Sequence, residues 1–187
     1  MHKNLSKILI KAFIGFSLCS ILFISSTHAR SVAAPGLKDK RTAVNGVLDL
    51  TDWDWQQDGI LPLNGQWEFY WHTLLTPDDF KDEEPILNRN LITLPRAWNK
   101  YEINRRKLTG AGYATFRLLI RHSTDQILGI KIPRIFTSYR LWANGELLSS
   151  VGQVAVDKDN ATPQYLTTVK YLKPETNPLE LVVQVSN

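Results

Sequence analysis

The chain has 187 residues, 43% of them hydrophobic, which fits one domain of ordinary size with a core of its own. Its formal net charge of +4 comes mostly from the N-terminus, since residues 1–29 hold three lysines and no acids, and without them the charge is about +1. Such a nearly neutral domain has no basic stripe to neutralise phosphates, and this excludes a nucleic-acid partner.

Residues 1–29 have the pattern of a secretory signal peptide. Lys3, Lys7 and Lys11 supply the basic start, and residues 12–24 form an uncharged run of 13 residues that ends shortly before a small-residue site at Ala29. That run is short for a membrane-spanning helix, which needs about 20 residues. We predict export with cleavage after Ala29, and an uncleaved anchor is the alternative. The only cysteine lies inside the run, so the exported domain must be stable without disulfides.

The next residues, 30–45, are polar and without periodicity, and we interpret them as a flexible leader to a domain spanning 46–187. Residues 47–50 begin the first predicted strand. In the strand 66–71 the aromatic residues Trp67, Phe69 and Trp71 share one face. Trp53 and Trp55 occupy the same strand phase, which suits either a sugar-stacking platform or cover for the edge of a sandwich.

The middle of the chain alternates short elements with loops. Thr76 and Pro77 begin a predicted helical turn that continues to Glu84. A short apolar stretch at 90–94 precedes a long polar loop at 98–108. Further strands are predicted at 113–121, 127–132, 165–172 and 179–185, and all except 165–172 show alternating apolar residues.

The strongest local signal is a hairpin over residues 135–152. Tyr139, Leu141 and Ala143 alternate with polar or outward residues, and Asn144-Gly145 follows. Asn-Gly between two apolar runs predicts a two-residue type I′ turn, because both turn residues need positive φ. The alternation predicts that one set of residues is buried between two sheets, namely Phe116, Leu118, Ile130, Leu141 and Val183.

Eight or nine short strands separated by turn residues describe an all-β jelly-roll sandwich behind a signal peptide. Motifs for enzyme chemistry are missing: the sequence has no G-x-S-x-G elbow and no phosphate-binding loop. The acidic pairs Asp78-Asp79 and Glu83-Glu84 fit a solvated helix start better than a glycosidase pair, which faces across a cleft. We therefore predict no catalytic residues and no cofactor.

Metal binding is also not predicted. His72 and His122 lie far apart without metal-ligand spacing. Asp157, Asp159 and Asn160 offer oxygen ligands of the type that calcium prefers, but a defined twelve-residue calcium loop is missing, so an ordinary polar loop is the favoured interpretation.

Five motifs in a fixed order carry a family resemblance: VLDLTDWDW, DGILPLNGQWEFYW, LPRAW, GYATFRLLI and SYRLWANGELLSSVG. In this order they resemble the N-terminal extracytoplasmic sensor domain of bacterial seven-transmembrane receptors with diverse intracellular signalling modules. The jelly roll is also similar to the sugar-binding domain of the beta-galactosidase and beta-glucuronidase family. The resemblance implies a galactose-binding-like fold over about residues 46–187.

From this resemblance we expect an extracytoplasmic ligand-sensing domain, not an enzyme, whose ligand is a carbohydrate or related small molecule. Its expected partner is a membrane-embedded seven-helix module, which the 187 residues do not include. The alternative is a non-catalytic sugar-binding accessory domain of a secreted glycoside hydrolase. An envelope structural or adhesion domain is a third reading, and carbohydrate rests on analogy of fold alone.

The predicted ligand site combines loop aromatics with polar groups near the central hairpin. Trp98 and Tyr101 are the best aromatic pair outside the periodic strands, with plugging of the sandwich end as the alternative role of Trp98. Arg134, Tyr139 and Arg140 are the predicted polar contacts, since sugars need a flat aromatic surface and hydrogen-bonding groups.

Overall fold

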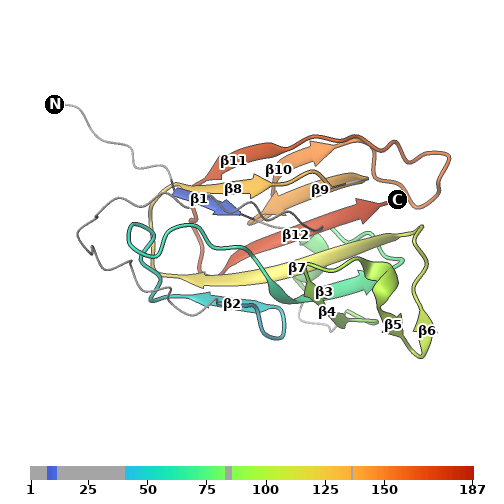
Figure 1. Cartoon of the computed structure of the whole chain (residues 1–187), viewed down its shortest axis with the longest axis horizontal. Coiled ribbons are helices and arrows are strands. Elements are labelled where there is room, and N and C mark those ends of the chain that lie inside the picture. The colour runs from blue at the N-terminus through green and yellow to red at the C-terminus, as the bar shows by residue number, and fades with distance from the viewer. Residues whose placement is uncertain (1–7, 12–40, 83–85, 136) are drawn as a thin grey trace, which may run out of the picture.

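The structure is a computed structural model that describes residues 8–11, 41–82, 86–135 and 137–187. These residues form two facing β-sheets and a small hairpin at one end (Figure 1). The smaller sheet has the strand order β1 (Ile8–Lys11), β8 (Leu128–Ile132) and β11 (Thr168–Leu172). The prediction of an all-β sandwich is confirmed.

The larger sheet has seven strands, six of them in the order β10-β9-β12-β7-β3-β4, with β2 pairing in parallel with β7. Their bounds are β2 Val47–Leu50, β3 Gly65–Trp71, β4 Asn90–Leu94, β7 Tyr113–His122, β9 Ser138–Ala143, β10 Glu146–Val151 and β12 Leu179–Ser186. The hairpin consists of β5 (Glu102–Ile103) and β6 (Arg106–Lys107). Two 3-10 helices complete the fold, η1 (Pro77–Phe80) and η2 (Trp98–Lys100).

The core lies between the two sheets, where alternate residues of each strand point inward. Four of the five predicted core residues are buried: Phe116, Leu118, Ile130 and Leu141. The fifth, Val183, is only half-buried, although it packs against the same core. Its neighbours on β12, Leu181 and Val185, are buried, so the phase predicted for this strand is correct.

The larger sheet is also covered on part of its outer face. Glu68 and Tyr70 of β3 are buried, whereas the alternation alone predicts an exposed face. Gln184 of β12 is buried as well, and its Nε2 donates to the Leu75 carbonyl oxygen at 3.0 Å. The segment around η1 therefore covers the outer face of β12.

The central hairpin has the turn that the sequence predicts. Asn144 and Gly145 have φ angles of 48° and 86° and connect β9 to β10, with Ala143 paired to Glu146. An added Cβ at Gly145 would meet no atom within 4 Å, so positive φ alone favours glycine there. Tyr139 and Leu141 point into the core, while Arg140 is exposed.

The tryptophans at 53 and 55 do not form an exposed platform. Both side chains are buried in the core, and the Trp53 indole donates to the Gly59 carbonyl oxygen at 3.3 Å. The sugar-stacking interpretation of this pair is therefore wrong. The loop that carries them folds back and closes one end of the sandwich core.

The folded part of the chain starts before residue 46. Ala43 is buried and hydrogen-bonded to Asn64, and Arg41 donates to the carboxylate of Asp52. Residues 41–45 of the predicted leader thus belong to the folded domain, and residues 30–40 lie outside the described residues. Of the predicted signal segment 1–29, the structure describes β1 alone, paired in parallel with β8. No helix among the described residues is long and apolar enough to cross a membrane.

Candidate functional site

A cavity of about 290 Å³ lies between the two sheets. Ile130 and Ile132 of β8 form one wall, and Leu141, Leu181 and Val183 of the larger sheet form the opposite wall. The exposure of Val183 is explained by this cavity. The described residues that line the cavity are Leu63, Trp67, Leu94, Arg96, Ala97, Trp98, Asn99, Gly110, Phe116, Ile130, Ile132, Pro133, Ile135, Thr137, Tyr139, Leu141, Leu181, Val183, Val185 and Asn187.

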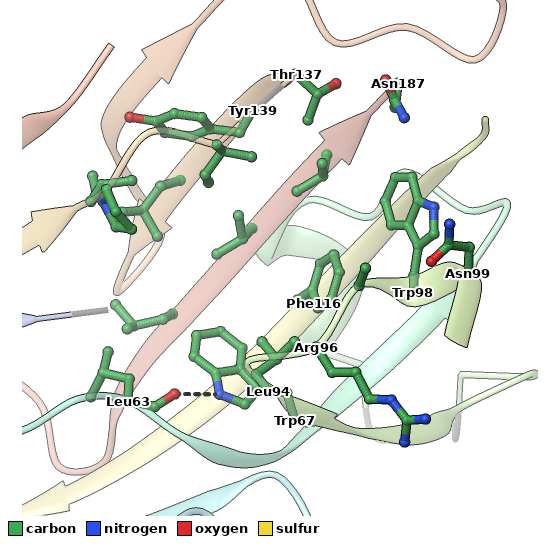
Figure 2. Close-up of a pocket in the computed structure, with 18 of the residues that line it drawn as sticks. Leu63, Trp67, Leu94, Arg96, Trp98, Asn99, Phe116, Thr137, Tyr139 and Asn187 are labelled. Atoms are coloured by element: carbon green, nitrogen blue, oxygen red, sulfur yellow. Dashed lines mark hydrogen bonds between the residues drawn. The ribbon is translucent and has the colours of Figure 1, made fainter. Parts of the chain in front are cut away.

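The two ends of the cavity differ in chemistry (Figure 2). Leu63, Trp67 and Leu94 lie at one end, and the Trp67 indole donates to the Leu63 carbonyl oxygen at 3.0 Å. All three residues are buried, so this end is closed. Trp98, Asn99, Thr137 and Asn187 lie at the other end, which we call the mouth. The lining residues Gly110 and Asn187 are exposed at this end. The mouth is therefore a polar entrance to an apolar interior.

Trp98 is held in place at the mouth by η2 and by two contacts. Its indole nitrogen donates to the Gly110 carbonyl oxygen at 3.0 Å, and its ring meets the edge of Trp71 at a centroid distance of 5.3 Å. The Asn187 amide donates to the same carbonyl oxygen at 2.9 Å. The indole therefore presents a fixed aromatic surface to the cavity, which is the geometry of a preorganised binding site.

Tyr139 lines the cavity from β9, but its hydroxyl is already engaged. The phenol oxygen lies 3.2 Å from Ser149 Oγ and 3.2 Å from Thr168 Oγ1. The bond to Thr168 connects the larger sheet to β11 of the smaller sheet. Tyr139 thus offers its ring to the cavity, and its hydroxyl ties the two sheets together.

Two polar atoms of the lining have no hydrogen-bond partner among the described residues: Thr137 Oγ1 and Asn99 Oδ1. Both atoms are buried, and the Thr137 residue is only 6% exposed. Leaving a buried polar group unpaired costs about 1–3 kcal/mol. Unpaired buried polar groups are uncommon in native structures, and two further ones, Asn64 Oδ1 and Gln184 Oε1, lie outside the cavity lining.

The structure brings only part of the predicted site together. Trp98 and Tyr139 line the cavity, whereas Tyr101, Arg134 and Arg140 do not. The Tyr101 hydroxyl accepts a hydrogen bond from the Thr93 N–H at 3.1 Å and donates to the Thr93 carbonyl oxygen, so it is tied to β4. Arg134 and Arg140 are exposed, and Arg140 points to the side of β9 opposite Tyr139.

Sequence reasoning missed Thr137, Asn99 and Asn187, as well as the apolar walls as a binding surface. The residues of the two cavity walls belong to the alternating apolar positions that predict the core. The sequence therefore predicts which residues face inward, but it does not predict the distance between the two sheets. Asn99 stands next to Trp98, and Thr137 lies directly before β9, two residues before Tyr139. Proximity to predicted site residues is the one sequence signal that could have pointed to them.

Three of the acidic residues considered for calcium or catalysis have local protein partners. Asp157 accepts hydrogen bonds from the Asn160 N–H at 2.9 Å and from Asn160 Nδ2 at 2.8 Å, which lower the pKa of its carboxyl. Asp79 accepts from the Thr76 N–H at 2.7 Å and Oγ1 at 2.8 Å, and Asp78 pairs with Lys81. Glu83 and Glu84 lie outside the described residues. Within the described ranges no group of three His, Cys, Asp or Glu side chains could hold a metal ion.

No protein-family model and no curated protein matches this sequence. Solved structures with partial similarity include beta-glucuronidases from an uncultured Clostridium species (16% identity, TM-score 0.47, 67% of this chain and 21% of that chain) and from Faecalibacterium prausnitzii (14%, 0.43, 66% and 20%). Another is the beta-D-glucuronidase of Dictyoglomus thermophilum (14%, 0.45, 67% and 19%). The chain spans about a fifth of the length of these enzymes.

Proposed function

We propose that this chain is a non-catalytic binding domain that takes a small molecule between its two sheets. The observation that carries the proposal is the cavity of about 290 Å³ with a fixed tryptophan and two orphaned polar atoms at its mouth. A well-formed apolar pocket with a few convergent polar groups is the usual form of a small-molecule site. Binding rather than turnover is the chemistry that these neutral polar groups support.

The biological setting that we propose is the extracytoplasmic side of a membrane receptor. The five ordered motifs and the export signal support it, and a seven-helix membrane module is then the partner that receives the signal. The alternative is an accessory sugar-binding domain of a secreted hydrolase. In that case the neighbouring gene sequence should have the alternating strand and helix pattern of an α/β barrel. Sequencing the gene on both sides of the segment separates the two: seven apolar spans support the receptor, and a barrel pattern contradicts it.

The binding role is tested by titrating the exported domain with a panel of small molecules while following tryptophan fluorescence. The panel contains mono- and oligosaccharides, alcohols, amides, carboxylates and small aromatic compounds. Trp67 and Trp98 line the cavity, so a molecule that enters it changes their emission. We expect at least one class to give a saturable response.

A cavity-filling variant tests whether the fluorescence response comes from binding inside the cavity. Val183→Phe places a larger side chain in the cavity and should abolish the response, whereas Val169→Phe makes the same change on β11 at a residue that is 39% exposed and outside the lining. Thermal unfolding of both variants checks that they fold. A panel without any saturable response, or a response that survives in a folded Val183→Phe variant, contradicts the proposal.

A further inference from the structure

We infer that the ligand combines an apolar body with a neutral head that donates a hydrogen bond, as an alcohol or a primary amide does. This inference rests on the proposed function, since it names the ligand class of the same cavity. It departs from the carbohydrate expectation, and the reason is the chemistry of the lining.

The walls of the cavity favour an apolar body. Between the mouth and the closed end, the lining consists of aliphatic and aromatic side chains, with Ile130, Leu141 and Val183 among them. A sugar placed there would bury several hydroxyl groups without partners, and each of them would lose its hydrogen bonds to water. An apolar cavity of ~150 Å³ holds benzene, so one of about 290 Å³ has room for a body about twice that size, such as a medium-length alkyl chain.

The orphaned atoms at the mouth define the head. Thr137 Oγ1 can donate and accept, whereas Asn99 Oδ1 can only accept. Figure 2 shows Asn99 beside Trp98, and Thr137 near Tyr139 on the other side of the mouth. A hydroxyl or amide group supplies the donor that Asn99 Oδ1 lacks and can also pair with the Thr137 hydroxyl. A carboxylate offers acceptors alone, so it would face the Asn99 oxygen with like polarity.

A cation that could offset a carboxylate is not directed into the cavity. Arg96 is the charged residue of the described lining, and its guanidinium carbon lies 5.0 Å from the centre of the Tyr101 ring. In Figure 2 the Arg96 side chain points away from the cavity. The predicted contacts Arg134 and Arg140 are exposed and outside the lining. The site is therefore matched to a neutral head.

The test compares four probes of similar size on the exported domain by tryptophan fluorescence: 1-octanol, octanamide, octanoate and methyl β-glucoside. We expect 1-octanol and octanamide to bind at least tenfold more tightly than octanoate at pH 8, and methyl β-glucoside to show no saturable response. Toluene, which has the apolar body without a head, serves as a fifth probe.

The variant Thr137→Val separates a ligand-binding hydroxyl from a structural one. It removes one hydrogen bond to the head, so it should weaken 1-octanol binding about three- to tenfold and leave toluene binding unchanged. Thr93→Val makes the same change at an exposed residue outside the lining and should alter neither probe. Unchanged 1-octanol affinity in a folded Thr137→Val variant would overturn the assignment of the head.

The outcomes also separate this inference from the proposed function. If octanoate or the glucoside binds more tightly than 1-octanol, and Val183→Phe abolishes that binding, the ligand class inferred here is wrong while the binding function stands. If none of the five probes and none of the wider panel binds, both are wrong.

Discussion

Thr137 combines two properties that rarely occur together in a core: it is almost fully buried, and its hydroxyl has no partner among the described residues. Its methyl group packs like that of valine, so the hydroxyl alone distinguishes the two side chains. An unpaired buried hydroxyl lowers stability, and the proposed ligand supplies the missing partner. The proposed site at the mouth therefore depends chiefly on Thr137.

Replacing Thr137 by valine should stabilise the unliganded domain. The change removes an unpaired buried hydroxyl and keeps the shape of the side chain, so we expect the free energy of unfolding to rise by about 1 kcal/mol. Urea denaturation without ligand measures it. A loss of stability would show that the hydroxyl has a structural partner, and it would remove the evidence for a polar mouth.

For single residues, the sequence predicts burial well but does not predict which buried polar atoms lack a hydrogen-bond partner. Phe116 and Leu141 are buried where alternation places them, because a strand directs every second side chain to the same face. Asn99 was not predicted as a site residue, because a missing hydrogen bond depends on all surrounding elements. Trp53 and Trp55 are buried, not stacked in solvent, because the loop between β2 and β3 folds over the sandwich end.

Among the elements, the turn between β9 and β10 is the one that the sequence specifies most completely. Asn144-Gly145 predicts it by a known signature, and the structure has positive φ at both residues. The smaller hairpin β5-β6 was predicted as loop. Its turn residues, Asn104 and Arg105, also have positive φ, at 51° and 62°, but arginine in place of glycine gives no turn signal.

The turn between β9 and β10 gives a prediction that depends on backbone conformation alone. Gly145→Val forces a β-branched residue to positive φ and should cost about 1–3 kcal/mol of unfolding free energy. Gly145→Asn is the matched control, because asparagine tolerates positive φ, and it should cost clearly less. Since no atom lies within 4 Å of the added Cβ, a clash does not obscure the comparison. Equal thermal midpoints for the two variants would contradict the type I′ assignment.

An ion network around the buried Glu68 joins three strands of the larger sheet on its outer face. Glu68 of β3 accepts hydrogen bonds from Tyr70 at 2.9 Å, from Arg89 at 2.9 Å and from Arg117 of β7 at 3.4 Å. Arg117 also donates to Glu180 of β12 at 2.7 Å. Burial raises the pKa of Tyr70, and the bond to Glu68 raises it further. The network thus bridges the neighbouring strands β12, β7 and β3 on the outer face.

Removing the charge of Glu68 should weaken the sheet. Glu68→Gln keeps the shape but leaves Arg89 and part of Arg117 without a counter-charge, so we expect a loss of about 2 kcal/mol. Asp78→Asn is the control, because the Asp78–Lys81 pair is exposed on both sides and should leave the urea midpoint unchanged. Equal midpoints for Glu68→Gln and the parent would show that the network contributes nothing to stability.

For the whole molecule, the sandwich architecture could be predicted from strand spacing and turn residues, but the cavity could not. The cavity depends on how far β8 stands from β9 and β12, and this distance is set by contacts between segments far apart in the chain, such as Tyr139 with Thr168. Ala43 is buried although it belongs to the predicted leader, because pairing with Asn64 draws that segment onto the domain.

The predicted signal peptide leads to a prediction about the intact protein. N-terminal sequencing of protein exported by a bacterial host should begin at Arg30, which removes β1 from its pairing with β8. The exported domain should remain folded, because β8 keeps its pairing with β11 and its buried residues Leu128, Ile130 and Ile132. Intact protein starting at Met1 in the cytoplasm would contradict export, and an unfolded exported chain would contradict an independent domain.

The central claim is that a small molecule binds between the sheets, and methyl NMR during a ligand titration tests it most directly. The account predicts that 1-octanol shifts the methyl resonances of Ile130, Ile132 and Val183, which face each other across the cavity, in one saturable process. The methyl resonances of Leu147 and Val169, which are exposed and outside the lining, should stay in place. Shifts confined to exposed methyl groups, with Ile130 and Val183 unchanged, would contradict it.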